Sequence, residues 1–119
     1  MHALIERISD LNDLIMQGRF KEAFEQFYHD DLIYQFNDEH PLKGKEVIRK
    51  LKENELNDIL EFKSAKPLKV TIGEQSTMVE WELNDQHRIH GERNYTQVSV
   101  QDWKQGLIIK EKMYCGSKS

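Results

Sequence analysis

The main change in the spacing of apolar residues along this chain falls near Asn57, where the period goes from about 3.6 residues to about two. Before Asn57, helical spacing predicts three helices: from Leu4 to Ile15, over residues 20–27, and from Gly44 onward. A strand over residues 32–37 separates the second helix from the third. After Asn57, alternation predicts strands near residues 60–72, 79–83, 88–101 and 107–115. Helices followed by strands with short connections favour an antiparallel sheet with the helices on one face, which is an α+β fold.

Three local features refine the predicted strands. Lys66 and Pro67 interrupt the alternation, and a proline inside a strand favours a bulge or an edge position because it cannot donate a sheet hydrogen bond. The polar residues 84–86 favour a turn, and so do residues 104–106, which include Gly106. We therefore expect turns at both places.

The length and charge of the chain limit its class. Its 119 residues suffice for one domain, which we place at residues 1–115, followed by a frayed tail at 116–119. The 17 basic and 21 acidic side chains give a net charge of −4, which argues against a partner recognised through a nucleic-acid backbone. No apolar run approaches the roughly 18 residues of a membrane span, and no secretory signal is visible at the start. We expect a cytoplasmic protein with no nucleic-acid or membrane partner.

Recognised metal and cofactor motifs are missing from the sequence. Cys115 is the single cysteine, which excludes an internal disulfide and a cysteine-rich zinc site. Residues 37–40 offer oxygen and nitrogen donors, but consecutive loop residues have no established ligand spacing, so a solvated loop is the favoured interpretation. Basic residues at 43–52 alternate with acidic ones and predict a solvated helix face. We expect no metal and no cofactor.

Several short motifs occur in an order that resembles a known family. They are Asp30-Asp31 near the first strand, Gly44 to Ile48 at the start of the third helix, and Trp103 to Ile108 in the last strands. Together they resemble the SnoaL-like branch of the nuclear transport factor 2-like superfamily. The resemblance implies a cone-shaped barrel, in which a strongly curved, mainly antiparallel sheet wraps around three helices. It also implies a pocket at the open end and, in many members, a dimer through the sheet.

The superfamily includes steroid isomerases, cyclases, dehydratases and epoxide hydrolases as well as many members without catalysis, so the resemblance leaves the function open. Isomerases of the superfamily carry a tyrosine and two acids at positions that correspond here to Leu11, Phe36 and Ser99. The resemblance therefore does not carry isomerase chemistry over to this chain.

The orientation of the last two strands decides which side chains face the pocket. If Trp103 points inward, as the resemblance implies, period-two counting turns Tyr95, Gln97, Ser99 and Gln101 inward as well. Across the Gly106 turn, the same counting places Ile109, Glu111, Met113 and Cys115 inward. Val98 and Val100 then face outward, where a second copy of the chain would cover them. This predicts a homodimer through the convex sheet.

Glu111 is the candidate acid/base group. A carboxylate among Trp81, Trp103 and Met113 is desolvated, which raises its pKa and suits it to proton transfer. In the alternative interpretation, Glu111 hydrogen-bonds Gln101, Arg93 or Tyr95 and only keeps the core in register. The predicted ligand-binding side chains are Tyr34, Phe36, Trp81, Tyr95, Gln97, Ser99, Gln101, Trp103 and Met113.

His90 and Cys115 each have a functional and a structural interpretation. His90 could form an acid/base pair with Glu92 or Glu111, but alternation turns it outward and favours a surface histidine. Cys115 has no predictable neighbour that would make it a thiolate, which favours a buried, inert cysteine.

Three hypotheses about function follow from these residues. The first is a protein that binds a small, largely apolar molecule in the cone pocket without converting it. The second is a cofactor-free isomerase, dehydratase or cyclase that uses Glu111. The third is a dimeric protein-interaction module.

Overall fold

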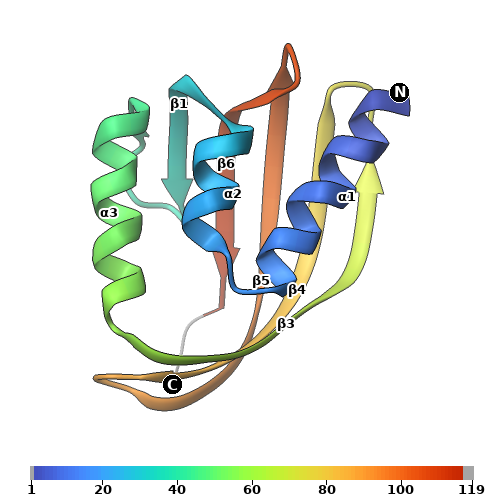
Figure 1. The fold of residues 1–119 in the computed structure, drawn as a ribbon. Coiled ribbons are helices and arrows are strands. Elements are labelled where there is room, and N and C mark those ends of the chain that lie inside the picture. The colour runs from blue at the N-terminus through green and yellow to red at the C-terminus, as the bar shows by residue number, and fades with distance from the viewer. Residues whose placement is uncertain (1, 117–119) are drawn as a thin grey trace.

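The computed structural model describes residues 2–116, and these form three helices and six strands (Figure 1). In chain order they are α1 (His2–Met16), α2 (Phe20–Phe27), β1 (Tyr28–Phe36), β2 (Leu42–Lys43), α3 (Lys45–Asn57), β3 (Ile59–Ile72), β4 (Ser76–His87), β5 (Gly91–Lys104) and β6 (Leu107–Cys115). The predicted α+β class is confirmed. Residues 117–119 of the predicted tail lie outside the described residues.

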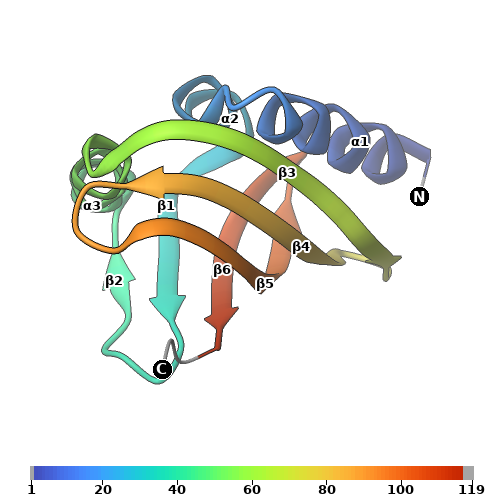
Figure 2. The ribbon, with the colours of Figure 1, turned by 90° about the horizontal axis from the view of Figure 1, so that it is seen from below.

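The strands form one mixed sheet in the order β2-β1-β6-β5-β4-β3. All neighbours are antiparallel except β1 and β6, which are parallel. Parallel neighbours need a long crossover, and the whole chain between the two strands supplies it. The long strands β3, β4 and β5 bend across the molecule, so that the sheet is strongly curved (Figure 2).

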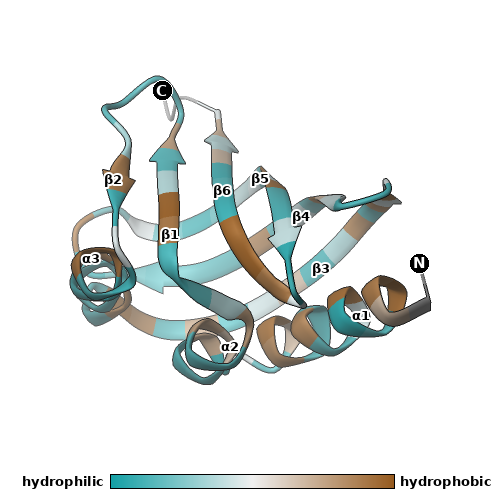
Figure 3. Cartoon of the chain, turned by 90° about the horizontal axis from the view of Figure 1, so that it is seen from above, coloured by the Kyte–Doolittle hydropathy of each residue, from teal (hydrophilic) through white to brown (hydrophobic). Residues whose placement is uncertain are grey.

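The helices lie along the concave side of the sheet. Contacts join α1 to α2 and β3, α2 to β1, and α3 to β1, β2 and β3. The apolar stretches of β1 and β6 lie side by side in the sheet (Figure 3). Completely buried apolar side chains come from all layers: Leu11 from α1, Ile48 from α3, Leu32 from β1, Val79 from β4 and Ile108 from β6. One core therefore joins the helices to the sheet.

A glycine permits the close turn between α1 and α2. Gly18 has a φ of +76°, a conformation that side chains disfavour, and a Cβ at this position would lie 2.7 Å from Cδ2 of Phe62. The turn thus brings α2 close to β3, where Phe20 and Phe62 pack edge to face with ring centroids 5.3 Å apart.

The predicted turn at residues 84–86 is wrong, since β4 continues to His87. Asp85 lies directly opposite Arg93 in the sheet, and the Arg93 guanidinium donates two hydrogen bonds of 2.8 Å to its carboxylate. This cross-strand ion pair overrides the turn preference of the polar residues. Strand β5 consequently begins at Gly91 rather than Arg88.

The first strand also differs from its prediction, because it begins at Tyr28, directly after α2. The last strand contains a bulge that the prediction lacked. Trp103 pairs with Ile108, whereas Asp102 pairs with Lys110, so Ile109 is an extra residue. Ile108 is therefore the buried residue, and the prediction that Ile109 faces inward is wrong. Alternation from Glu111 onward follows the prediction.

The interruption at Lys66 and Pro67 behaves as predicted in both respects. Strand β3 is an edge strand, and its register shifts between Pro67 and Lys69. In the loop after β1, the side chain of Asn37 accepts a hydrogen bond from the backbone N–H of Cys115 and donates one to its carbonyl. Asn37 thus ties the loop to the end of β6.

Within the described residues, no helix is long and apolar enough to cross a membrane. The cytoplasmic location of the protein stays a prediction from the sequence.

Candidate functional site

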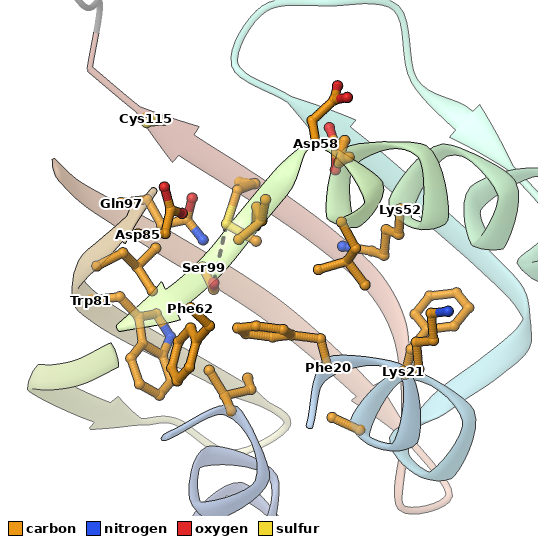
Figure 4. A pocket seen from close by; sticks show the side chains of 18 of the residues that line it. Phe20, Lys21, Lys52, Asp58, Phe62, Trp81, Asp85, Gln97, Ser99 and Cys115 are labelled. Carbon is orange, nitrogen blue, oxygen red and sulfur yellow. Dashed lines mark hydrogen bonds between the residues drawn. The ribbon is translucent and has the colours of Figure 1, made fainter. Parts of the chain in front are cut away.

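A cavity of about 420 Å³ lies between the helices and the concave face of the sheet. Its walls come from α1, α2 and α3 on one side and from β1 and β3 to β6 on the other (Figure 4). Figure 4 shows Phe20 reaching in from α2, Lys52 from α3, and Phe62 and Trp81 from the sheet. Aromatic rings on opposite walls thus face one interior space.

Most of the predicted ligand-binding residues line this cavity. They are Tyr34, Phe36, Trp81, Tyr95, Gln97, Ser99 and Met113, together with the predicted acid/base group Glu111. Gln101 and Trp103 are buried, but they are not among the lining residues. The amide of Gln101 and the indole of Trp103 take part in a hydrogen-bond chain that ends at Glu111.

This chain holds Glu111 in place. Trp103 Nε1 donates to Thr77 Oγ1 at 2.9 Å, and the Thr77 hydroxyl donates to Gln101 Oε1 at 2.6 Å. Gln101 Nε2 then donates to Glu111 Oε2 at 3.0 Å. The hydroxyl of Tyr28 also donates to Glu111 Oε2, at 2.7 Å. All five side chains are buried, so the network fixes the carboxylate in a single orientation.

The second carboxylate oxygen of Glu111 is different. Glu111 is 1% exposed, and Oε1 is the buried side-chain nitrogen or oxygen within residues 2–116 that has no hydrogen-bond partner. The nearest charge is Lys52 Nζ, 3.8 Å away, which is an ion pair beyond hydrogen-bond length. The core-register interpretation of Glu111 thus accounts for Oε2, through Gln101, but not for Oε1.

Lys52 does not follow its prediction. The alternation of basic and acidic residues at 43–52 predicts a solvated helix face for the whole segment, Lys52 included. Its side chain is only 22% exposed and lines the cavity, and its ammonium lies 4.4 Å from the centroid of the Tyr34 ring. Lys45, 11% exposed, also turns inward and donates to the carbonyls of Glu25 and Tyr28. Lys52 follows the buried Ile48 by four residues, so helical spacing could have indicated the inward direction.

The buried tyrosines remain protonated donors. Burial and the nearby charge of Glu111 raise the pKa of Tyr28 and of Tyr34 well above the ordinary value. Burial raises the pKa of Tyr95 to about 12, although the positive charge of Arg93 opposes the change. The three phenols therefore offer O–H groups, not anions, at neutral pH.

A second group of polar side chains lines the cavity near the β4–β5 hairpin. It consists of the Asp85–Arg93 ion pair and two stacked histidines, His87 and His90, with ring centroids 4.9 Å apart. His90 is exposed, as predicted, and it does not contact Glu111, whereas His87 is buried. His87 Nδ1 accepts hydrogen bonds from the backbone N–H groups of Ile89 and His90. Its role here is to close the hairpin turn.

Cys115 ends on the cavity wall, as predicted, and is half-buried. Its Sγ donates to the carbonyl of Thr96 at 3.7 Å. Among the described residues, no three His, Cys, Asp or Glu side chains converge on one point at which a metal could bind.

Solved structures of other proteins show the same fold. A candidate SnoaL-like polyketide cyclase from Mesorhizobium loti superposes with a TM-score of 0.82 at 19% identity, covering 93% of this chain and 97% of that one. A nuclear transport factor 2-like protein of unknown function from Burkholderia pseudomallei K96243 gives 0.81 at 10% identity, covering 98% and 92%. An epoxide hydrolase from M. tuberculosis, described as LEH-like, gives 0.76 at 13% identity, covering 98% and 84%.

The chain therefore has the nuclear transport factor 2-like fold, and its structural neighbours include SnoaL-like proteins. This confirms the fold that the sequence resemblance implied. No protein-family profile matches the chain, and no curated protein sequence matches it.

Proposed function

We propose that this protein binds a small, largely apolar molecule in the cavity between the helices and the sheet. The observation that carries the proposal is the cavity itself: it is preformed, has a volume of about 420 Å³, and is lined by aromatic and aliphatic side chains together with charged and polar ones. Ligand pockets commonly enclose about 300–1,000 Å³ and combine apolar walls with a few placed polar groups. The chain could have filled this space with side chains, which would have added packing energy.

Native mass spectrometry of freshly purified protein, followed by denaturing release, tests this proposal. A retained apolar compound of small mass supports it and identifies the ligand class. As a second readout, Trp81 lines the cavity, so its fluorescence should change when an apolar ligand binds. If no small apolar compound is retained and a broad set of such compounds leaves the Trp81 emission unchanged, the binding function is wrong.

Acid/base chemistry at Glu111 is a second candidate. The observation that favours it is the buried Oε1, a carboxylate oxygen that borders the cavity without a hydrogen bond. Such an oxygen can accept a proton from a bound molecule. Glu111→Gln should then abolish turnover of a substrate while the apolar body of the ligand still binds. A preparation that keeps its rate after this substitution would exclude the acid/base role.

We also propose that the convex face of the sheet joins two copies of the chain. Met78, Val98, Val100 and Tyr114 are partly or fully exposed neighbours on adjacent strands, flanked by Glu80 and Lys112. In a twofold dimer this surface meets itself, so that an acidic and a basic side chain can pair across the axis. Val98→Lys should give monomers in sedimentation analysis. An unchanged dimer would place the interface elsewhere, and a monomeric parent protein would remove the proposal.

A further inference from the structure

One point inside the cavity combines two opposite charges that do not hydrogen-bond each other. Glu111 Oε1 and Lys52 Nζ lie 3.8 Å apart, and both residues line the cavity. A hydrogen bond between these atoms would bring them to roughly 2.8 Å. An uncompensated buried carboxylate oxygen is costly, so the fold leaves an acceptor here that a bound group can satisfy.

The surroundings explain why the two groups stay apart. Tyr28 and Gln101 both donate to Oε2, which fixes the carboxylate plane and leaves Oε1 directed elsewhere. The ammonium of Lys52 lies over the ring of Tyr34 at 4.4 Å and is 6.0 Å from the ring centroids of Phe24 and Tyr28. The ammonium is thus surrounded by aromatic faces at its place beside the carboxylate.

The space between Glu111 Oε1 and Lys52 Nζ favours one kind of ligand group. A group that hydrogen-bonds both atoms has to donate to Glu111 Oε1 and accept from Lys52 Nζ, and a hydroxyl group can do both. The hydroxyl would donate its proton to Glu111 Oε1 and accept one from Lys52 Nζ. We propose that the apolar ligand carries a neutral hydroxyl group, which Glu111 and Lys52 bind between them at this point of the cavity.

Other polar groups fit the pair less well. A carbonyl oxygen accepts from Lys52 but faces the carboxylate of Glu111 with its lone pairs. An ammonium donates to Glu111 but is repelled by Lys52, and a carboxylate is repelled by Glu111. Of these groups, only a hydroxyl both donates and accepts without bringing in a charge. Lys52 is thereby a residue that determines ligand specificity.

This inference rests on the proposed function, so its test uses ligands that share one carbon skeleton. Indane, indanol, indanone and aminoindane have the same bicyclic body and differ only in the polar group. Isothermal titration calorimetry at pH 7 measures the Kd of each for the full chain. We expect indanol to bind about tenfold more tightly than indane or indanone, since hydrogen bonds to charged groups contribute about 1.5–3 kcal/mol before desolvation of the hydroxyl.

Two substitutions change the selectivity in different ways. Lys52→Met removes one of the two partners and leaves Glu111 Oε1 as an acceptor, so the preference of indanol over indane should fall several-fold while the Kd of indane stays the same. Lys50→Met is the matched control, because Lys50 lies on the same helix with an exposed side chain and does not line the cavity. In Glu111→Gln the amide N–H and Lys52 both donate, so indanone should become the preferred ligand over indanol. Thermal unfolding of each variant verifies its fold.

Each outcome distinguishes the inference from the proposed function. If indane and indanol bind with equal affinity, the cavity binds apolar molecules but Glu111 and Lys52 do not bind a ligand hydroxyl between them. The inference is then wrong. It is equally wrong if Lys52→Met leaves the size of the preference for indanol undiminished, or if Glu111→Gln leaves the order of indanol and indanone unchanged. If no member of the series binds, the result counts against the proposed function and removes the inference with it.

Discussion

Replacing Tyr28 by phenylalanine removes one of the two hydrogen bonds to Glu111 Oε2 and changes nothing else in the covalent structure. The hydroxyl of Tyr28 lies 2.7 Å from this oxygen, and both residues are buried, at 7% and 1% exposure. Water therefore has little access to replace the lost donor. After the substitution, Gln101 Nε2 is the remaining hydrogen-bond donor to the carboxylate in the described residues.

The expected cost follows from the burial and the charge. A hydrogen bond to a charged group contributes about 1.5–3 kcal/mol, and here no other group can take its place, so we expect a loss of about 2 kcal/mol in the free energy of unfolding. Unfolding entropies of about 2.1 cal/mol/K per residue then give a fall of about 8 °C in Tm for a chain of 119 residues.

The assay is urea unfolding at pH 7 in a double-mutant cycle that combines Tyr28→Phe with Glu111→Met. If the two groups stabilise each other, the coupling free energy should be about 2 kcal/mol, because the double variant no longer buries an unsatisfied carboxylate. Lys50→Met is the control, since Lys50 is exposed on α3 and does not line the cavity, and it should change stability by less than about 0.5 kcal/mol. A coupling below about 0.5 kcal/mol would refute the reasoning that this network holds Glu111.

Two further predictions concern the loops. Gly18→Ala should lower the free energy of unfolding in urea by about 2 kcal/mol, and Gly91→Ala should lower it by about 1 kcal/mol. Both glycines have a positive φ, but only a Cβ at position 18 would lie against Phe62. Equal costs would show that the Phe62 ring moves freely. Burial, with the charges of Arg93 and His90, lowers the pKa of His87 although Asp58 and Asp85 oppose this. The unfolded chain then binds the extra proton first, so the stability contributed by His87 is complete above about pH 6.5 and falls as the pH drops below it. His87→Gln should flatten this part of the stability profile, and an unchanged slope would assign it to another group.

The positions of helices and strands were accessible from the sequence because they depend on the spacing of apolar side chains within a segment. The stripe of Phe20, Phe24 and Phe27 predicted the short helix α2. Pro67 predicted either an edge position or a bulge, and β3 has both. The inward direction of Glu111 also followed from alternation, since β5 and β6 keep their period on either side of one bulge.

Tertiary structure decided the features that depend on partners distant in the chain. The ion pair of Asp85 with Arg93 extends β4 through a predicted turn, and the bulge at Ile109 reverses which of two neighbouring isoleucines is buried. Neither can be read from local spacing, because each depends on the register between two strands. Gln101 and Trp103 are buried as expected, yet they are not among the residues that line the cavity.

The sequence by itself therefore determined the order of elements, the fold class and the side of the sheet on which Glu111 lies. Only the tertiary structure brought Lys52 of α3 to within 3.8 Å of that carboxylate and left Oε1 without a hydrogen bond. The physical reason is that spacing fixes the direction of a side chain relative to its own element, whereas the distance between two charges depends on how the elements pack.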